Sequence, residues 1–171
     1  MSHSGTVDDG SPAGVSIAHL ERTPRSPAKA PFKFSATTRV GFSDTDAQGI
    51  VYYGRYLPYF DLARVEYHRS LGLLGMDIGE EGEEFVMRAC TIEYFAPAVF
   101  DDVIEVYCRL ARIGRTSATW EFAADRAKDD VLVVTAKQTL VLVDLDERKA
   151  VPIPDDYKDA IRAFEGDDLE A

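Results

Sequence analysis

Residues 44–64 read DTDAQGIVYYGRYLPYFDLAR, and this stretch decides how the chain around it folds. Two carboxylates, Asp44 and Asp46, precede Gly49, and an aromatic-rich segment with helical spacing follows at once. A carboxylate at a junction of loop and helix lies beside backbone N–H groups that have no intrahelical partner. Such donors can polarise a carbonyl or hold an oxyanion, as acyl-transfer chemistry requires. From spacing alone, a turn or a helix cap is the simpler interpretation of the pair.

The segment after this loop has the period of an amphipathic helix. We expect a helix over residues 53–71, because its apolar residues recur every three or four positions. They are Leu57, Phe60, Ala63, Tyr67 and Leu71. Pro58 falls near the start, where a missing N–H is tolerated, and Gly72 and Gly75 are expected to end the helix.

Strands are expected on both sides of the helix. The sequence predicts one strand over residues 33–42 and, where the period changes to two, four more over residues 85–95, 103–113, 116–126 and 131–145. Most of the later strands are joined by short turns, so they must pair antiparallel, since a parallel crossover needs about a dozen residues. One amphipathic helix and one antiparallel sheet can bury each other's apolar faces. We therefore expect an α+β fold in which a curved sheet wraps around the helix.

Composition indicates one folded domain with two tails. A chain of 171 residues, of which 46% are hydrophobic, has enough material for a single core. Residues 1–31 are rich in Ser, Pro, Gly and Ala and are expected to be a disordered extension. The folded domain is expected over residues 32–157. The remaining residues, 158–171, belong to a strongly acidic end that we interpret as a solvated tail.

Charge and cysteine content limit the partners and the compartment. The net charge of −11 argues against nucleic acid, because phosphates bind to basic surfaces. No apolar run approaches the ~18 residues that a membrane span requires. No hydrophobic signal segment is present either, so we expect no membrane association and a cytoplasmic location. Cys90 and Cys108 lie in apolar alternating stretches and are expected to be buried thiols in a reducing compartment.

The opening stretch also carries a family resemblance. The pattern Asp44-x-Asp46-x-x-Gly49-x-Val51-Tyr52-Tyr53 resembles the active-site region of the hotdog-fold acyl-CoA thioesterases, in the 4-hydroxybenzoyl-CoA thioesterase-like family. Later segments match in register, including Ile92-Glu93-Tyr94-Phe95-x-Pro97, so the resemblance covers about residues 32–157. It implies a hotdog fold, with a curved antiparallel five-stranded sheet around one long central helix. It also implies hydrolysis of an acyl-CoA without a metal or cofactor, in a homodimer or homotetramer.

The resemblance further implies a role for each residue of the motif. Asp46 would be the catalytic residue, acting as a nucleophile on the thioester carbonyl or as a general base on water. The backbone N–H of Tyr53 would bind the thioester oxygen at the start of the helix. Gly49 would let the loop pass close to the substrate, and Asp44 would order the loop. The candidates for the acyl pocket are Val51, Tyr52 and Tyr56. The candidates for binding the CoA phosphates are Arg88, Arg109, Arg112, Arg115 and Lys137.

Alternative functions were weighed against the same residues. Asp44 and Asp46 match the first ligand positions of an EF-hand loop, but Arg55 stands where the bidentate glutamate is required. A hydratase of the same fold would need an Asp/His pair, and His68 is too far from Asp46 in sequence. A non-catalytic module that binds acyl-CoA or acyl-carrier protein stays open. A binder needs no carboxylate aimed at the thioester, so Asp46 favours the enzyme.

Overall fold

The computed structural model describes residues 29–74 and 81–170. Its helices and strands largely follow the predicted order. They are β1 (Phe34–Arg39), α1 (Tyr56–Ser70), β2 (Glu83–Tyr94), β3 (Val103–Ile113), β4 (Ser117–Arg126), β5 (Val131–Asp144), β6 (Lys149–Ala150) and α2 (Asp155–Glu165). Single 3-10 turns occupy Phe42–Asp44, Tyr53–Arg55 and Gly166–Asp168. Among the described residues, no helix is long and apolar enough to cross a membrane.

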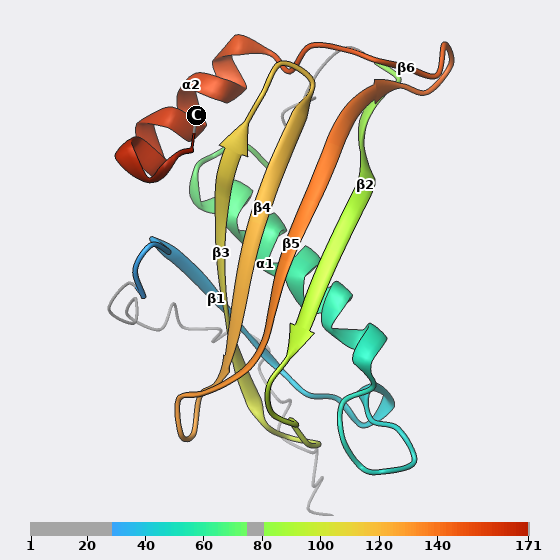
Figure 1. The fold of residues 1–171 in the computed structure, drawn as a ribbon, viewed down its shortest axis with the longest axis vertical. Helices are drawn as coiled ribbons and strands as arrows, with labels where there is room; N and C mark the ends of the chain where they lie inside the picture. The colour runs from blue at the N-terminus through green and yellow to red at the C-terminus, as the bar shows by residue number, and fades with distance from the viewer. Residues whose placement is uncertain (1–28, 75–80, 171) are drawn as a thin grey trace, which may run out of the picture.

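One antiparallel sheet forms the main layer of the protein. The strand order is β1-β3-β4-β5-β2, and the short β6 pairs with β5. All the pairs in this order are antiparallel, as the short turns between β3, β4 and β5 predict. The sheet curves around α1, which crosses its inner face (Figure 1). The prediction of a curved five-stranded sheet around one long helix is therefore confirmed, with β6 as an addition.

The core lies between α1 and the inner face of the sheet. Phe60 and Tyr67 are completely buried on one side of the helix, and their rings meet the β4 aromatics. The ring centroids of Phe60 and Phe122 are 4.9 Å apart, and those of Tyr67 and Trp120 are 5.1 Å apart. Burial of each such side chain contributes about 1.5–3 kcal/mol, so this aromatic layer fixes α1 on the sheet.

The helix begins slightly later than its apolar pattern predicts. Residues 53–55 form a separate 3-10 turn, and α1 begins at Tyr56. Pro58 then occupies the third helical position, where no intrahelical donor is needed. Gly72 follows the helix with φ of +73°, which a glycine adopts without strain. Gly75, the other predicted stop, lies outside the described residues.

The C-terminal end differs from the expected solvated tail. Residues Asp155–Glu165 form α2, whose apolar face packs against α1 and the sheet. Tyr157 and Ile161 are buried, and the ring of Phe164 lies 5.3 Å from that of Tyr67. The acidic composition of this segment led to the prediction of a solvated tail. Its apolar residues, however, are spaced by three and four positions, as in a helix with one buried face. The predicted disordered extension falls mostly on residues 1–28, which lie outside the described residues.

The two cysteines have different environments. Cys108 is completely buried, as predicted, but Cys90 is exposed. The alternating pattern of β2 identifies a strand but does not show that β2 is the last strand of the sheet. Among the described strands β2 has a neighbour on one side only, and the Cys90 side chain reaches the surface there.

Candidate active site

Asp46 lies in a tight turn between β1 and α1. Its backbone N–H donates to the carbonyl of Ile50 at 2.9 Å, and its own carbonyl accepts the Gly49 N–H at 3.0 Å. The carboxylate accepts the backbone N–H of Gln48 at 2.8 Å and is half-buried. Gly49 closes the turn with φ of +77°, a conformation that favours glycine. The Gln48 side-chain amide, with its nitrogen facing Asp46, donates to the same carboxylate at 2.9 Å. The turn thus holds the carboxylate through Gln48 and presents it near the surface.

Asp44 is held much more firmly than Asp46. Its Oδ2 accepts the Gly41 N–H and the Tyr59 hydroxyl, both at 2.8 Å. Its Oδ1 accepts Nε of Arg55 at 3.0 Å. Burial opposes the charge, but the bonds from Tyr59 and Gly41 and the Arg55 guanidinium lower the pKa of Asp44. Asp44 therefore ties the loop to the first turns of α1 and has little capacity left for substrate.

The peptide predicted to bind the thioester oxygen, that of Tyr53, lies in the 3-10 turn just before α1. In the part of the chain that the structure describes, the Tyr53 N–H donates to no backbone carbonyl. The Tyr53 carbonyl is fixed, because it accepts the hydroxyl of Tyr94 at 3.0 Å. A bridge between Thr45 and Val51 joins the two sides of the loop. Asp46 therefore follows Thr45 directly on one side of this bridge. The Tyr53 peptide lies two residues after Val51 on the other side.

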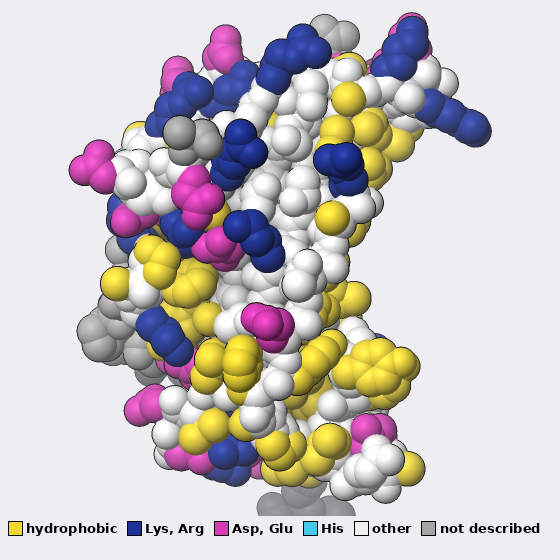
Figure 2. All heavy atoms as spheres, in the orientation of Figure 1, with side chains coloured by type: hydrophobic (Ala, Val, Ile, Leu, Met, Phe, Trp, Pro, Cys, Tyr) yellow, Lys and Arg dark blue, Asp and Glu magenta, His cyan; other side chains and the backbone are white. Residues whose placement is uncertain are grey.

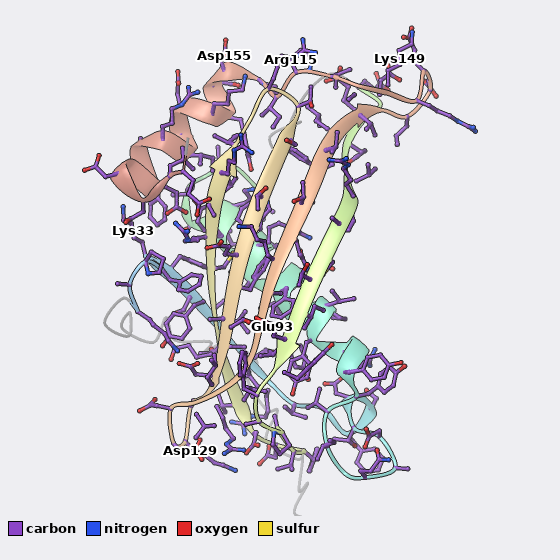
Figure 3. The ribbon with its side chains drawn as sticks, viewed as in Figure 1. Lys33, Glu93, Arg115, Asp129, Lys149 and Asp155 are labelled. Carbon is purple, nitrogen blue, oxygen red and sulfur yellow. The ribbon has the colours of Figure 1, made fainter. Side chains whose placement is uncertain are left out.

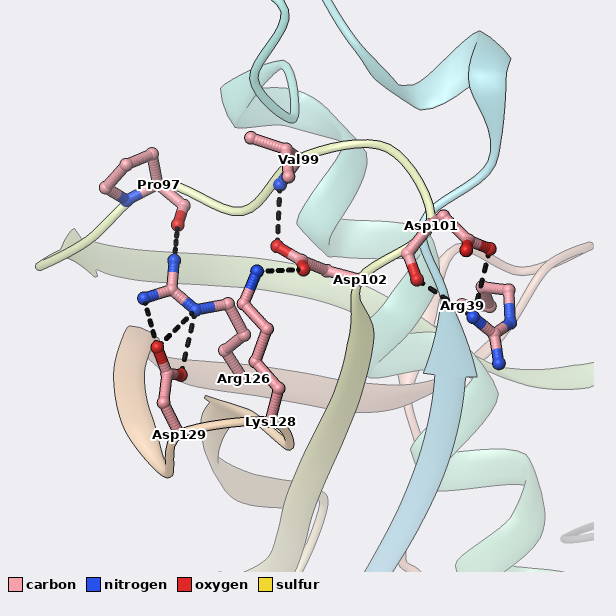
Figure 4. A network of polar contacts seen from close by, with 8 residues as sticks. All are labelled: Arg39, Pro97, Val99, Asp101, Asp102, Arg126, Lys128 and Asp129. Atoms are coloured by element: carbon pink, nitrogen blue, oxygen red, sulfur yellow. Dashed lines mark hydrogen bonds and ion pairs between the residues drawn. The ribbon is translucent and has the colours of Figure 1, made fainter.

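A second loop, residues 95–102, supports the Asp46 loop from behind. The Val51 N–H donates to the Ala98 carbonyl at 2.9 Å. Asp102 shapes this second loop, because its carboxylate accepts the Val99 N–H at 3.0 Å and Nζ of Lys128 at 2.6 Å (Figure 4). Burial opposes its charge, yet these partners lower the pKa of Asp102.

Two arginines complete the support of the second loop. The Arg126 guanidinium pairs with Asp129 and donates to the Pro97 carbonyl at 2.7 Å (Figure 4). On the other side, Arg39 donates to the backbone carbonyl and the carboxylate of Asp101. The position of the Asp46 loop therefore depends on charges contributed by β1 and by the β4–β5 turn.

The structure separates the three residues predicted to line an acyl pocket. Val51 and Tyr56 are buried below the loop, whereas Tyr52 is 43% exposed and its ring is tilted against that of Tyr53, with ring centroids 4.2 Å apart. Burial raises the pKa of Tyr56 to about 12, so this phenol stays neutral. Their contact with an acyl group stays a prediction.

Two of the cations proposed for the CoA phosphates are poorly placed. Arg109 is buried and donates from Nε and Nη2 to Glu121 at 2.9 and 2.7 Å. Arg115 lies in the β3–β4 turn, at the end of the sheet opposite the Asp129 turn and the loop before α1 (Figure 3). Sequence spacing could show neither the burial of Arg109 against Glu121 nor the end of the sheet at which Arg115 lies.

Three supporting residues were not assigned a role from the sequence. Tyr94 belongs to the motif that carries the resemblance, so its position was visible but its bond to Tyr53 was not. Asp102 stood out only as half of an acidic pair before a strand. Gln138, buried in β5, gave no signal because a lone glutamine in a strand is expected on the solvent face.

A long helix wrapped by a curved antiparallel sheet is the architecture of the hotdog fold. Residues 40–161 match the sequence model of the thioesterase-like superfamily. The acyl-CoA thioesterase YbgC of Haemophilus influenzae is 34% identical over 128 residues, which are 74% of this chain and 93% of that protein.

Solved structures agree with this assignment. A 1,4-dihydroxy-2-naphthoyl-CoA thioesterase from Synechocystis has a TM-score of 0.69 and 26% identity, covering 75% of this chain and 94% of that chain. A hypothetical protein from Aquifex aeolicus has a TM-score of 0.67 and 33% identity, covering 75% of this chain and 98% of that chain. The chain belongs to the thioesterase-like superfamily. It is an enzyme, a thioester hydrolase with the hotdog fold.

Proposed function

We propose that this enzyme hydrolyses acyl-CoA thioesters to the free acid and CoA, with Asp46 as the catalytic residue. The observation that carries the proposal is the contrast between the two aspartates of the loop. Asp44 accepts from Gly41, Tyr59 and Arg55, which tie it to the rest of the loop and to α1, whereas Asp46 is held by Gln48 of its own exposed turn and is partly open to solvent. The relatives named as acyl-CoA thioesterases support the choice of CoA as the carrier.

The proposed chemistry uses two groups of the loop. The thioester oxygen accepts the Tyr53 N–H, and the N-terminal end of the helix stabilises the charge that develops on this oxygen. As a general base, Asp46 takes a proton from water while the water oxygen bonds to the carbonyl carbon. As a nucleophile, it forms an anhydride that water then cleaves. In both cases the C–S bond breaks, and the CoA sulfur leaves and gains a proton.

The proposal includes assembly as a homodimer, or as a homotetramer built from such dimers. Among the described strands, β2 pairs only with β5 and forms one edge of the sheet, where a strand from another chain can pair. Apolar side chains along and beyond this strand are exposed, among them Met87 at 45% and Phe95 at 57%. Figure 2 shows the margin on the side of β2 to be hollowed and bordered by apolar side chains. A second copy seated along β2 would cover both features.

The catalytic assignment is tested with Asp46→Ala and Asp46→Asn. We expect kcat to fall by at least about 100-fold with KM little changed, which is roughly 3 kcal/mol of barrier. Release of free CoA thiol from a panel of acyl-CoAs is the measurement. Asp159→Asn, on the exposed face of α2, is the matched control. Near wild-type turnover in Asp46→Ala would refute the assignment. Tight acyl-CoA binding by the wild type without CoA release would favour the non-catalytic module.

Assembly is tested on the same enzyme. Light scattering after gel filtration is expected to give the mass of two or four chains. Met87→Glu is expected to shift that mass toward one chain, because it places a charge on the uncovered edge. A wild-type protein that elutes as one chain while fully active would exclude the dimer as the working unit.

A further inference from the structure

Gln138 is an unusual residue for the core of this sheet. It lies on the inner face of β5 and is completely buried, between Trp120 of β4 and Cys90 of β2 in the strand register. Its Oε1 accepts Nη1 of Arg64 from α1 at 3.0 Å. Because a guanidinium has only donors, the oxygen must face Arg64 and the amide nitrogen must point away. The bond therefore fixes the orientation of the carboxamide.

The amide nitrogen is left without a strong acceptor. Within the described residues, no oxygen or nitrogen accepts from Gln138 Nε2. Its register neighbour is the Cys90 sulfur, a weak acceptor, and this contact offsets part of the burial that raises the pKa of Cys90. Buried donors in native proteins almost always have an acceptor, so an unpaired one requires an explanation. A ligand oxygen would satisfy this nitrogen, because no oxygen of the described residues accepts from it.

The surroundings indicate what kind of atom would fit. Arg64 also forms an ion pair with Asp61, so the cluster of Asp61, Arg64 and Gln138 is electrically balanced. A carboxylate ligand would be repelled by the negative charge of Asp61. A neutral hydroxyl or carbonyl oxygen would accept from Gln138 without this repulsion. The cluster lies at the border of the core, because Cys90 and the Asp61 side chain beside it are exposed.

The cluster of Asp61, Arg64 and Gln138 lies further along α1 and β2 than the proposed reaction centre at the start of α1. β2 ends at the same end of the protein at which α1 begins (Figure 1). At that end, Tyr94 of β2 bonds to the Tyr53 carbonyl. Arg64 is eight residues beyond Tyr56, which corresponds to about 12 Å along the helix. Cys90 is four residues before Tyr94, which corresponds to about 13 Å along the strand.

We propose that Gln138 and Arg64 form the distal end of the acyl-binding site and select acyl groups of medium length that carry a hydroxyl or carbonyl oxygen near the far end. The inference rests on the proposed function, since the thioester must lie at the start of α1. The acyl chain would then run between α1 and the inner residues of β2. Its distal oxygen would accept the Gln138 amide, and the Arg64–Asp61 pair would hold that amide in place.

The first experiment uses the wild-type enzyme and matched substrates. Hexanoyl-, octanoyl- and decanoyl-CoA are compared with their ω-hydroxy derivatives by CoA release. We expect kcat/KM to favour the hydroxylated member by at least about 10-fold at one chain length, because a site built to bond an oxygen rejects the analogue that lacks it. Equal kcat/KM within every pair would overturn the inference alone. No hydrolysis of any acyl-CoA would instead overturn the proposed function.

The second experiment removes the donor. Gln138→Met keeps the side-chain length without an N–H, and we expect the preference for the hydroxylated substrate to fall to within about twofold of unity. Thr139→Val is the matched control, because Thr139 lies next in β5 on the outer face of the sheet. Retention of the full preference in Gln138→Met would overturn the inference. The wild-type ratios decide the matter even if this variant does not fold.

Discussion

α1 meets a carboxylate near each of its ends, and the two contacts look alike. Near its start, the Tyr59 hydroxyl donates to Asp44 at 2.8 Å. Two turns later, the Tyr67 hydroxyl donates to Glu165 of α2 at 2.7 Å. Despite this similarity, the pKa of Asp44 is lowered and that of Glu165 is raised.

The difference between the two contacts comes from burial and from the nearest cation. Glu165 is completely buried, its Oε2 has no partner within the described residues, and burial outweighs the bonds from Tyr67 and Leu110. Asp44 is less deeply placed and receives Nε of Arg55 directly. The comparison shows that a phenol alone does not set the charge of a carboxyl group. The same contact supports an ionised Asp44 in the loop that carries Asp46, whereas in the core it accompanies a Glu165 that favours the protonated form.

The largest expected effect on stability comes from substitution of Glu165, the buried carboxyl group of the two. Glu165→Ala leaves a cavity and removes the acceptor of the Tyr67 hydroxyl and the Leu110 N–H. We expect a loss of about 3 kcal/mol in the free energy of unfolding, measured by urea denaturation. Glu147→Ala, in the exposed β5–β6 turn, is the control and should cost less than about 0.5 kcal/mol. A similar small loss for both variants would show that α2 contributes little to stability.

Asp44→Ala probes the ionised side and should have a smaller effect on stability. Three donors lose their acceptor, but they are nearer to solvent, so we expect a loss of about 2 kcal/mol. Turnover should fall as well, because the loop that carries Asp46 is no longer tied to Tyr59 and Arg55. Asp146→Ala, in the exposed β5–β6 turn, is the control. Wild-type turnover in Asp44→Ala would mean that the Asp46 turn keeps its shape without this support.

The smallest effect is on the pH dependence of stability, and its sign differs between the two groups. The raised pKa of Glu165 means that its contribution is present below its unfolded pKa, about 4.3, and is lost as the pH rises through the folded pKa. The lowered pKa of Asp44 means that its contribution is present above about pH 4 and is lost as the pH falls.

Two substitutions separate these contributions in urea denaturation series from pH 4 to 8. Glu165→Gln should abolish the decline on the alkaline side, because the amide cannot ionise. Asp44→Asn should leave that decline in place and lower stability most near neutral pH. A Glu165→Gln protein that still loses stability with the wild-type slope would assign the decline to another group.

Much of the fold was predictable because it depends on local period. The change from a period near 3.6 over residues 56–70 to a period of two afterwards identified α1 and the long strands. The start of α2 was missed because acidic residues alternate with its apolar face. Contacts such as Tyr67 with Glu165 join residues 98 positions apart, so no local pattern contains them.

The candidate site was predictable only in part, for the same reason. The motif placed Asp44, Asp46 and Gly49 in one loop, since they are neighbours in sequence. It could not show that Asp44 takes up three donors, or that the loop rests on residues 95–102. The exposure of Cys90 and the burial of Gln138 depend on the order of the strands in the sheet. The sequence does not show that β2 is an edge strand or that β5 lies inside the sheet.

The strand order also has a consequence for how the chain is made. β1 and β2 are synthesised early, but they pair with β3 and β5, which emerge later. At the usual pace of translation, β2 waits roughly 3 to 10 seconds for the end of β5 to leave the ribosome. During that interval the apolar side of α1 has no sheet to cover it. The nascent chain is therefore expected to be a client of ribosome-associated chaperones until the β3–β4–β5 meander captures the helix.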